Sequence, residues 1–339
     1  MAIALLGLSP HQVPARTGIR QIFTCRSVEE GLNSLRTRVD FCFHPRVSKT
    51  VRSICLLNVA FKLITKVLAV RLSRVAGKII RECQTTFIPG RYILDGVVIL
   101  HEVIHELSVR KLEGIILKLD FEKAYDKVQW SFLFDVIRKK SFDEIWIQWV
   151  GKATLNGRVA ININGEVDGY FKTQKGLRQG DPISPLLFNL VADALSEMLT
   201  LAKEAGHLEG VVPNLVPGGL THLQYADDTI LFLQNTEENI LTVKFLLYCF
   251  EAMSGMKINY QKSEVFVIGV DDAEAQRIAE KFNCERGKFP MKYLGIPISS
   301  VRLTVADFAA SPDKLEKRLA TWKCGHLSYG GKAILVNSS

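Results

Sequence analysis

Two strand-like segments of the sequence carry aspartates where their apolar pattern ends. Residues 114–119 (GIILKL) form a short apolar run, typical of a buried strand, that stops at Asp120. Residues 220–234 read as two strands joined through a turn that contains Asp227 and Asp228. A charged side chain at either place would be exposed where a buried sheet ends. This pattern constrains the fold most, because it requires a sheet that presents carboxylates at the ends of its strands.

The remaining segments mix helical and strand patterns without a regular βαβ repeat. This order favours an α+β fold with an antiparallel sheet backed by helices. Helices are expected over residues 57–72, 94–107, 130–140, 184–201 and 237–255, and further strands over 158–163, 166–173, 258–268 and 291–298. Asn164 and Gly165 between two of these strands are a strong hairpin signal. We expect Ser184 and Thr236 to cap two of the helices, with Pro185 at a first helical position.

The composition is that of an ordinary folded protein with a basic surplus. The 339 residues are 47% hydrophobic and 23% charged, and the formal net charge is +8. A basic surplus suits a polyanionic partner such as nucleic acid, although a solvated basic surface gives the same excess. The seven cysteines are scattered without a C-x-x-C pair, which argues against a disulfide framework or a closed zinc site and favours a reducing compartment. No apolar run is expected to reach the length of a membrane span.

Carboxylates that gather at the end of a sheet suit phosphoryl transfer to a hydroxyl group. That reaction uses two Mg²⁺ ions about 3.5–4 Å apart, one at the attacking oxygen and one at the leaving phosphates. Mg²⁺ takes hard oxygen ligands, so aspartates from adjacent strands would provide its protein ligands. Two aspartates in a turn are, on their own, only a turn. The sequence around the aspartates is therefore needed to distinguish a metal site from a simple turn.

Seven short blocks of sequence surround the aspartates. They are RSICLLN (52–58), QTTFIPGR (84–91), LDFEKAYDKV (119–128), GLRQGDPISPLLFN (176–189), QYADDTILF (224–232), SGMKINYQKS (254–263) and KYLGIPI (292–298). In this order they resemble two finger motifs and motifs A to E of reverse transcriptases, with wording closest to the LINE-type (non-LTR) retrotransposons of plants. One such block is a weak signal, but seven in order are very specific. The resemblance covers about residue 52 to the C-terminus.

The resemblance implies a right-hand polymerase with fingers and an antiparallel palm sheet backed by helices. It assigns residues 51–113 to part of the fingers and 114–300 to the palm, with finger elements between motifs A and B. Residues 301–339 would begin a connection and thumb that is truncated, and the family's endonuclease is missing. Residues 1–50 are unassigned, and we expect them to be poorly ordered. The implied partners are an RNA template, a DNA primer and dNTPs, with no membrane and no indicated oligomeric state.

The same resemblance assigns the catalytic centre. Asp120, Asp227 and Asp228 would be the catalytic carboxylates and the ligands of two Mg²⁺ ions, for which Mn²⁺ can substitute. Clustered acids repel one another when empty, and divalent cations relieve that repulsion. Tyr125, five residues after Asp120, falls at the family's steric-gate position, where a bulky ring would collide with a ribose 2′-hydroxyl. The alternative for Tyr125 is a half-buried core aromatic residue.

Further contacts are implied by the place of residues in the motifs. Nucleotide contacts are implied for Arg52, Phe121, Tyr125, Gln179, Gly180 and Lys262. Template or primer contacts are implied for Gln84, Gly90, Arg91, Arg178, Tyr225, Leu294 and Gly295. An arginine guanidinium can bind a triphosphate in a bidentate manner, and glycine allows close approach of the backbone. Lys262 has the plain alternative of a surface lysine.

Three functional interpretations stay open at this point. The first is an RNA-directed DNA polymerase with two-metal chemistry, which the intact aspartates favour. The second is a catalytically inactive retrotransposon remnant that keeps the palm fold and binds nucleic acid. The third is another right-hand polymerase, such as a group II intron maturase or telomerase, against which the wording of motif B argues. The family's Arg-Pro-Ile is replaced here by Arg52 and Ser53, which loosens the finger strand but keeps the charge. No nuclear-localisation run is evident, so the sequence points no further than an intracellular place, nucleus or cytoplasm.

Overall fold

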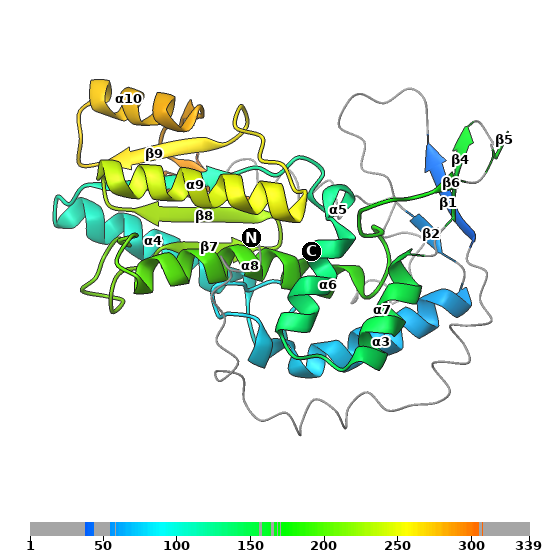
Figure 1. The fold of residues 1–339 in the computed structure, drawn as a ribbon. Coiled ribbons are helices and arrows are strands. Elements are labelled where there is room, and N and C mark those ends of the chain that lie inside the picture. Colours follow the sequence, from blue (N-terminus) through cyan, green and yellow to red (C-terminus); the bar gives the residue numbers. More distant parts are fainter. Residues whose placement is uncertain are drawn as a thin grey trace, which may run out of the picture.

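The structure is a computed structural model that describes residues 38–43, 55–57, 59–155, 158–163, 166, 167, 169, 171–304 and 307. Arg52 and most of segments 1–50 and 301–339 therefore lie outside the described residues. The described chain forms a central sheet flanked by helices and, beside it, a second group of helices with a smaller arrangement of strands (Figure 1).

The central sheet has the strand order β10-β9-β3-β8-β7. These strands are β3 (Gly114–Leu119), β7 (His222–Tyr225), β8 (Asp228–Leu233), β9 (Glu264–Ile268) and β10 (Glu285–Arg286). β3 pairs antiparallel with β8 on one side and with β9 on the other, and β7 pairs antiparallel with β8. The short β10 runs parallel to β9. The predicted antiparallel sheet is confirmed, and β3 is its middle strand.

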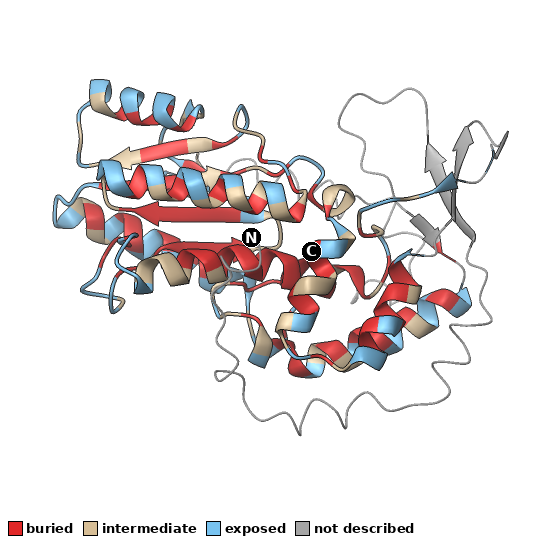
Figure 2. Ribbon diagram, viewed as in Figure 1, coloured by how far each residue is buried: buried red, intermediate tan, exposed pale blue. Residues whose placement is uncertain are grey.

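Both faces of this sheet are covered. The covering elements are α4 (Ile93–Val109), α8 (Ser184–Glu204), α9 (Glu237–Ser254), α10 (Asp272–Phe282) and the hairpin of β11 (Met291–Tyr293) and β12 (Ile296–Ile298). Ile115 and Leu117 of β3 join the core formed with α8, α9 and α10, whereas Ile116 joins the core formed with α4 and the hairpin. Successive side chains of a strand point to opposite faces, so a strand covered on both faces is an almost continuous apolar run, here interrupted by the half-buried Lys118. Figure 2 shows β8 as buried over most of its length.

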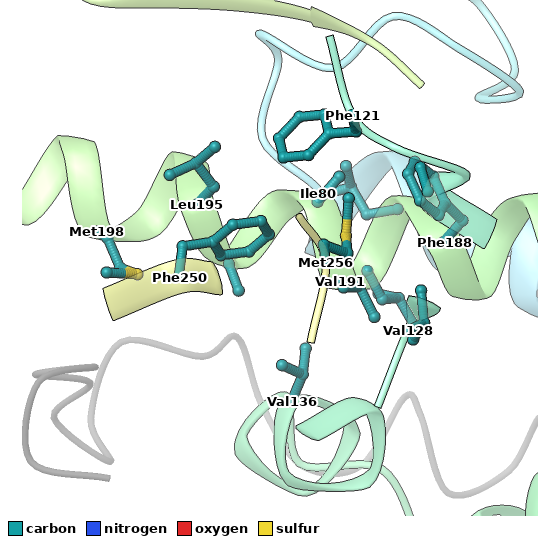
Figure 3. Packing of buried hydrophobic residues seen from close by; sticks show 14 of the residues in the cluster. Ile80, Phe121, Val128, Val136, Phe188, Val191, Leu195, Met198, Phe250 and Met256 are labelled. Atoms are coloured by element: carbon teal, nitrogen blue, oxygen red, sulfur yellow. The ribbon is translucent and has the colours of Figure 1, made fainter. Parts of the chain in front are cut away.

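Helix α8 runs through the larger of the two cores. Its residues Phe188, Val191 and Leu195 lie near Phe121 and Phe250 (Figure 3). The rings of Phe121 and Phe250 meet edge to face with centroids 6.2 Å apart, and full burial of such a side chain contributes roughly 1.5–3 kcal/mol.

The apolar composition of α8 has a second consequence. By length and composition alone this helix could cross a membrane, so the prediction that no run has that length was wrong. Of its most apolar window, 72% is buried inside the protein. Packing therefore explains the apolar character of α8.

The second group of elements lies beside the central sheet. It contains α3 (Val59–Ile79), α5 (Ala124–Lys127), α6 (Trp130–Lys139), α7 (Glu144–Leu155), β1 (Arg38–Phe43), β2 (Cys55–Leu57), β4 (Arg158–Ile163), β5 (Glu166–Val167) and β6 (Phe171–Lys172). α3 and α6 both contact α8, which joins this group to the central sheet. β4 and β5 pair antiparallel, which confirms the predicted hairpin. β1 was not predicted, and it pairs parallel with β4.

Two predicted strands differ from the structure. The strand expected over residues 258–268 begins at Glu264, because the preceding backbone turns and bonds to the segment that follows β3. The strand expected over residues 291–298 is instead the β11–β12 hairpin, which turns at Leu294 and Gly295.

The predicted helices are all present, with differences at their ends. Ser184 is the first residue of α8 and not its cap, since Ile183 precedes it without a side-chain cap. Thr236 caps α9 as predicted by accepting a hydrogen bond from the amide of Asn239. Gly255 ends α9 in the left-handed region. α7 and α10 were not predicted.

Candidate active site

Three aspartates lie at one end of the central sheet. The antiparallel register of β3 and β8 pairs Leu119 with Thr229, so Asp120, which follows β3, comes beside Asp228, which begins β8. Asp227 immediately precedes Asp228 in the turn between β7 and β8. Asp120 and Asp227 are half-buried, and Asp228 is exposed. The sheet thus places side by side two strand ends that carry aspartates from two distant motifs.

The backbone on either side of Asp120 is held by the segment 257–263. The amide of Asp120 donates to Ser263 Oγ at 3.1 Å, and its carbonyl accepts from the amide of Asn259 at 2.7 Å. The amide of Glu122 donates to the Lys257 carbonyl at 2.8 Å. The segment that resembles motif D therefore braces the strand end that carries Asp120.

The turn between β7 and β8 contains Ala226 in a strained conformation. Tyr225 pairs with Asp228, so Ala226 and Asp227 form a two-residue turn. Ala226 has φ +55°, a left-handed conformation that costs a residue with a Cβ roughly 1–2 kcal/mol. The turn needs support from its surroundings to keep this geometry.

Tyr125 lies close to the aspartates. Its ring stacks on Phe188 of α8, with centroids 4.5 Å apart and planes 7° apart. Burial raises the pKa of Tyr125 above its ordinary value, and the negative charge of Asp227 raises this pKa further, so the hydroxyl stays neutral. Lys123, with φ +44°, is the N-cap of the short helix α5, which contains Tyr125. The ring is packed on the core, as the core-aromatic interpretation expects, and the steric-gate role stays a prediction.

The loop that resembles the start of motif B packs against α5. The amide of Leu177 donates to the Tyr125 carbonyl at 2.7 Å. Gly176 has φ +92°, and a Cβ there would lie 2.7 Å from the Asp126 carbonyl oxygen. Gln179 Nε2 donates to Asp126 Oδ1 at 3.4 Å. Burial raises the pKa of Asp126, and the Lys123 charge and the Gln179 hydrogen bond oppose this shift. The neighbouring Gly180, at φ +96°, is exposed.

Arg178 of the same loop is bound inside the protein. Its Nη1 donates to the Ala153 carbonyl, and its Nη2 donates to the Thr154 carbonyl at 3.3 Å. The guanidinium also lies over the Phe61 ring, 5.3 Å from its centroid. In this structure Arg178 secures the end of α7, so its predicted template contact would require these bonds to be exchanged.

Arg91 is held in a comparable way. Its Nη1 donates to the carbonyls of Arg81 and Gln84 at 2.6 Å, and its Nη2 donates to that of Ile80 at 2.9 Å. These bonds secure the C-terminal end of α3. The nearby Gly90, with φ +81°, is exposed and has open space around it.

Gln84 is fully buried and lies behind the turn of Ala226 and Asp227. Its Oε1 accepts from the Ala226 amide at 3.0 Å and from the Thr86 amide at 3.2 Å. Sequence reasoning missed this contact, because it joins residues that are 142 positions apart.

The β11–β12 hairpin brings the predicted primer-side residues near the aspartates. Leu294 and Gly295 form its turn, with φ values of +50° and +88°. Burial raises the pKa of Tyr293, and the charges of Asp228 and Tyr225 raise this pKa further. Tyr293 pairs with Ile296 next to this turn, so the turn end of the hairpin lies near the start of β8.

The remaining predicted nucleotide contacts lie around Asp120. Phe121 is buried and bridges to Ile258, and its ring belongs to the core. Lys262 is exposed on the turn that braces Asp120. Its charge helps to hold the pKa of Glu122 below the usual range, after the larger effects of Lys127. Arg52 lies outside the described residues.

The donor atoms at the end of the sheet suit a magnesium ion in part. Carboxylate oxygens are the ligands that Mg²⁺ prefers, and the ion commonly takes one or two from the protein and the rest from water and substrate phosphates. Within the described residues, no three histidine, cysteine or acidic side chains are close enough together to form a complete metal site. The aspartates therefore fit an ion whose coordination a substrate completes.

Comparisons with known proteins identify the family of the chain. Residues 44–298 match the sequence model of the family described as "Reverse transcriptase (RNA-dependent DNA polymerase)". The chain is similar to the "Transposon TX1 uncharacterized 149 kDa protein" of Xenopus laevis, with 27% identity over 86% of this chain and 22% of that protein. It is also similar to the "Retrovirus-related Pol polyprotein from type-2 retrotransposable element R2DM" of Drosophila melanogaster, with 27% identity over 63% of this chain and 20% of that protein.

The chain spans only about a fifth of the length of these relatives. Among solved structures, it resembles telomerase from Candida albicans in complex with a fragment of telomeric RNA, with a TM-score of 0.51 and 12% identity over 86% of this chain and 50% of that one. This likeness confirms the right-hand polymerase fold, and the relatives confirm the resemblance to non-LTR retrotransposons. The chain therefore belongs to the reverse transcriptase family.

Proposed function

We propose that this chain is the polymerase core of a retrotransposon reverse transcriptase, which extends a DNA primer with dNTPs on an RNA template. One observation carries the proposal: the β3–β8 register brings Asp120 beside Asp228, with Asp227 in the adjoining turn. Phosphoryl transfer depends mainly on placing charged groups around the reacting phosphate, and this sheet end supplies them.

In this proposal Asp120 and Asp227 hold the catalytic ions, with Asp228 as the third carboxylate beside them. Two bound Mg²⁺ ions would activate the attacking 3′-oxygen and stabilise the leaving phosphates. The chain contributes rigidity, because β3 and β8 are both interior strands and segment 257–263 fixes the backbone of Asp120. A carboxylate on a fixed backbone loses little freedom when it binds an ion.

The nucleotide would lie between the aspartates and the loop that precedes α8. Tyr125 would contact its sugar, and Phe121 supports this wall from the core. Gln179, Gly180 and Lys262, together with Arg52, stay candidates for contacts to the base or phosphates.

The primer and template would lie along the surrounding elements. Tyr225 and the turn of Leu294 and Gly295 would face the primer end, since the hairpin lies near the start of β8. Gly90, Arg91 and Arg178 stay candidates on the template side, whereas Gln84 is fully buried. In the same proposal residues 114–300 form the palm, 51–113 form part of the fingers, and 301–339 begin the thumb.

Removal of divalent metal should abolish the activity. Purified protein is incubated with dNTPs and a DNA primer annealed to an RNA template, with Mg²⁺, with excess EDTA, and with EDTA followed by excess Mg²⁺ or Mn²⁺. We expect primer extension only in the reactions with free metal, because the charges at the sheet end need cations to accept a triphosphate. Extension that persists in EDTA contradicts the metal assignment. Nucleic-acid binding without extension in Mg²⁺ supports the inactive remnant instead.

Replacing Tyr125 with alanine should admit ribonucleotides. The ring at this place is held by its stacking on Phe188, so its removal opens space beside the sugar. We expect the ratio of kcat/KM for dNTP to that for rNTP to fall by at least about tenfold, which corresponds to roughly 1.4 kcal/mol of discrimination. Tyr125→Phe should keep the ratio, because the excluding group is the ring and the neutral hydroxyl adds no charge.

A matched control for this experiment is Tyr248→Ala. Tyr248 is an exposed tyrosine of α9, so the same substitution there should leave sugar discrimination unchanged. Unaltered discrimination in Tyr125→Ala would remove the gate assignment.

A further inference from the structure

We infer that Gln84 is a positioning residue for the catalytic turn, acting through the amide of Ala226. This inference rests on the proposed function, since it concerns how the same site keeps its geometry. No part of it requires Gln84 to touch nucleic acid, which the resemblance had implied. The inference begins from the conformation of the turn and from what lies behind it.

In the turn of Ala226 and Asp227, the backbone amide of Ala226 needs a hydrogen-bond acceptor. Ala226 adopts φ +55°, which a residue with a Cβ rarely does. Gln84 Oε1 accepts from the Ala226 amide at 3.0 Å. Since the amide of Ala226 lies one residue before Asp227, fixing this amide limits where the carboxylate can stand.

Gln84 is itself held rigidly against the strand that leads into the turn. The amide of Gln224 in β7 donates to the Cys83 carbonyl at 2.8 Å, and the amide of Thr85 donates to the Gln224 carbonyl at 3.1 Å. These two bonds form an isolated parallel bridge between Gln84 and Gln224. The backbone of Gln84 is thus fixed beside β7, and its side chain reaches forward to Ala226.

The bridge is fixed in turn by α8. Ser196 Oγ donates to Gln224 Oε1 at 2.7 Å, and Gln224 Nε2 donates to the Ala192 carbonyl at 3.3 Å. Gln224 and Ser196 are both buried. The strand that enters the turn, the residue that supports it and the central core helix therefore form one connected unit.

Packing alone does not account for a glutamine at this place. Gln84 is 0% exposed, and its Nε2 has no hydrogen-bond partner among the described residues. A buried donor without a partner is costly, and an apolar side chain of similar shape would avoid that cost. The oxygen of the same carboxamide, by contrast, accepts two backbone amides. A glutamine is explained at this position because its side-chain oxygen accepts the hydrogen bond from the Ala226 amide in the turn.

The first test isolates the acceptor oxygen of Gln84. Gln84→Met keeps the shape and removes the acceptor, whereas Gln84→Glu keeps an acceptor oxygen in place of the carboxamide, and burial favours its uncharged form. Hydrogen–deuterium exchange of peptides that contain Ala226 needs no activity. We expect exchange at this amide to become at least about tenfold faster in Gln84→Met than in Gln84→Glu or the wild type, because the bond to Oε1 protects it. Equal exchange in all three proteins would overturn the inference, whether or not the chain polymerises.

The second test uses primer extension in Mg²⁺ and measures three quantities: kcat, the Mg²⁺ concentration for half-maximal rate, and the Kd for primer–template. In Gln84→Met we expect kcat to fall by about ten- to a hundredfold, because small displacements of catalytic groups have effects of this size. The Mg²⁺ requirement should rise, and the Kd for primer–template should stay within about twofold, as expected where only the placement of Asp227 changes. Gln84→Glu should retain more activity at saturating Mg²⁺.

A matched control is Gln276→Met, the same substitution at an exposed glutamine of α10. It should match the wild type in all three quantities. A Gln84→Met protein with wild-type kcat and Mg²⁺ requirement would overturn the positioning role. The same holds for a variant whose sole defect is weaker primer–template binding, since that result assigns Gln84 to the template. An inactive wild type with normal metal binding would count against the proposed function, while the exchange experiment still decides the role of Gln84.

Discussion

Replacing Asp227 with alanine is expected to lower the rate of primer extension on the order of 10³-fold or more, with little change in the free energy of unfolding. The rate should fall because this carboxylate is one of the two proposed ligands of the catalytic ions, and their charge stabilises the transition state directly. Stability should hold because Asp227 is half-buried in a turn and is not part of the core. Losing a charge near Asp228 also removes repulsion.

The measurement is single-turnover primer extension in Mg²⁺, together with urea unfolding of the same preparations. A matched control is Asp135→Ala, because Asp135 is a surface aspartate of α6 whose partner is Arg138, three residues away. The control should polymerise like the wild type. If the two alanine variants and the wild type gave the same low signal, the chain would be a remnant without polymerase activity.

The largest effect on stability is expected from Asp193→Ala in α8. The Asp193 side chain is 1% exposed, and its Oδ2 accepts from Lys140 Nζ at 2.5 Å. Its Oδ1 accepts from the Arg81 amide at 2.9 Å. Removing one partner of a buried ion pair leaves the other charge uncompensated, which costs about 3–5 kcal/mol. Because Lys140 follows α6 and Arg81 follows α3, this variant should loosen the attachment of both helices to the core.

Urea denaturation would measure this cost as a shift of the unfolding midpoint. Asp193→Asn should be intermediate, because an amide oxygen still accepts from Arg81 while the charge is lost. Asp135→Ala serves here as the exposed counterpart, since its ion pair with Arg138 is solvated and should contribute less than about 1 kcal/mol. Equal unfolding midpoints for Asp193→Ala and Asp135→Ala would show that the buried ion pair contributes no more to the free energy of unfolding than the exposed one.

The parts of the fold that the sequence predicted best are those with strong local patterns. The apolar run 114–119 and the cap at Thr236 were readable because each depends on neighbouring residues. The common sheet end of Asp120 and Asp228 is not local, but it could be expected from the strand ends and the order of the motifs. Helix α10 was not predicted, although Asp271 caps it. Its apolar residues are few and are separated by charged residues.

The contacts that sequence reasoning missed depend on pairs of residues far apart in the chain. Arg178 and Arg91 matched motif positions, but their guanidinium groups bind backbone carbonyls at the ends of α7 and α3. No local sequence pattern distinguishes an arginine that binds carbonyls at a helix end from one that binds a phosphate. Both roles use the same N–H donors of the guanidinium group. The bond from the Ala226 amide to Gln84 was missed for a similar reason, since it depends on a bridge between the segment after α3 and strand β7.

The location of the aspartates within the strand order determines whether the site keeps its geometry when the sheet partly unfolds. Asp120 follows β3 and Asp228 begins β8, and each of these strands has a hydrogen-bonded neighbour on both sides. Fraying starts at the outermost strands, here β7 and β10, because these have a neighbour on one side only. Separation of β10 would leave the pairing of β3 with β8 whole, so the spacing between the two acids would persist until the sheet itself comes apart.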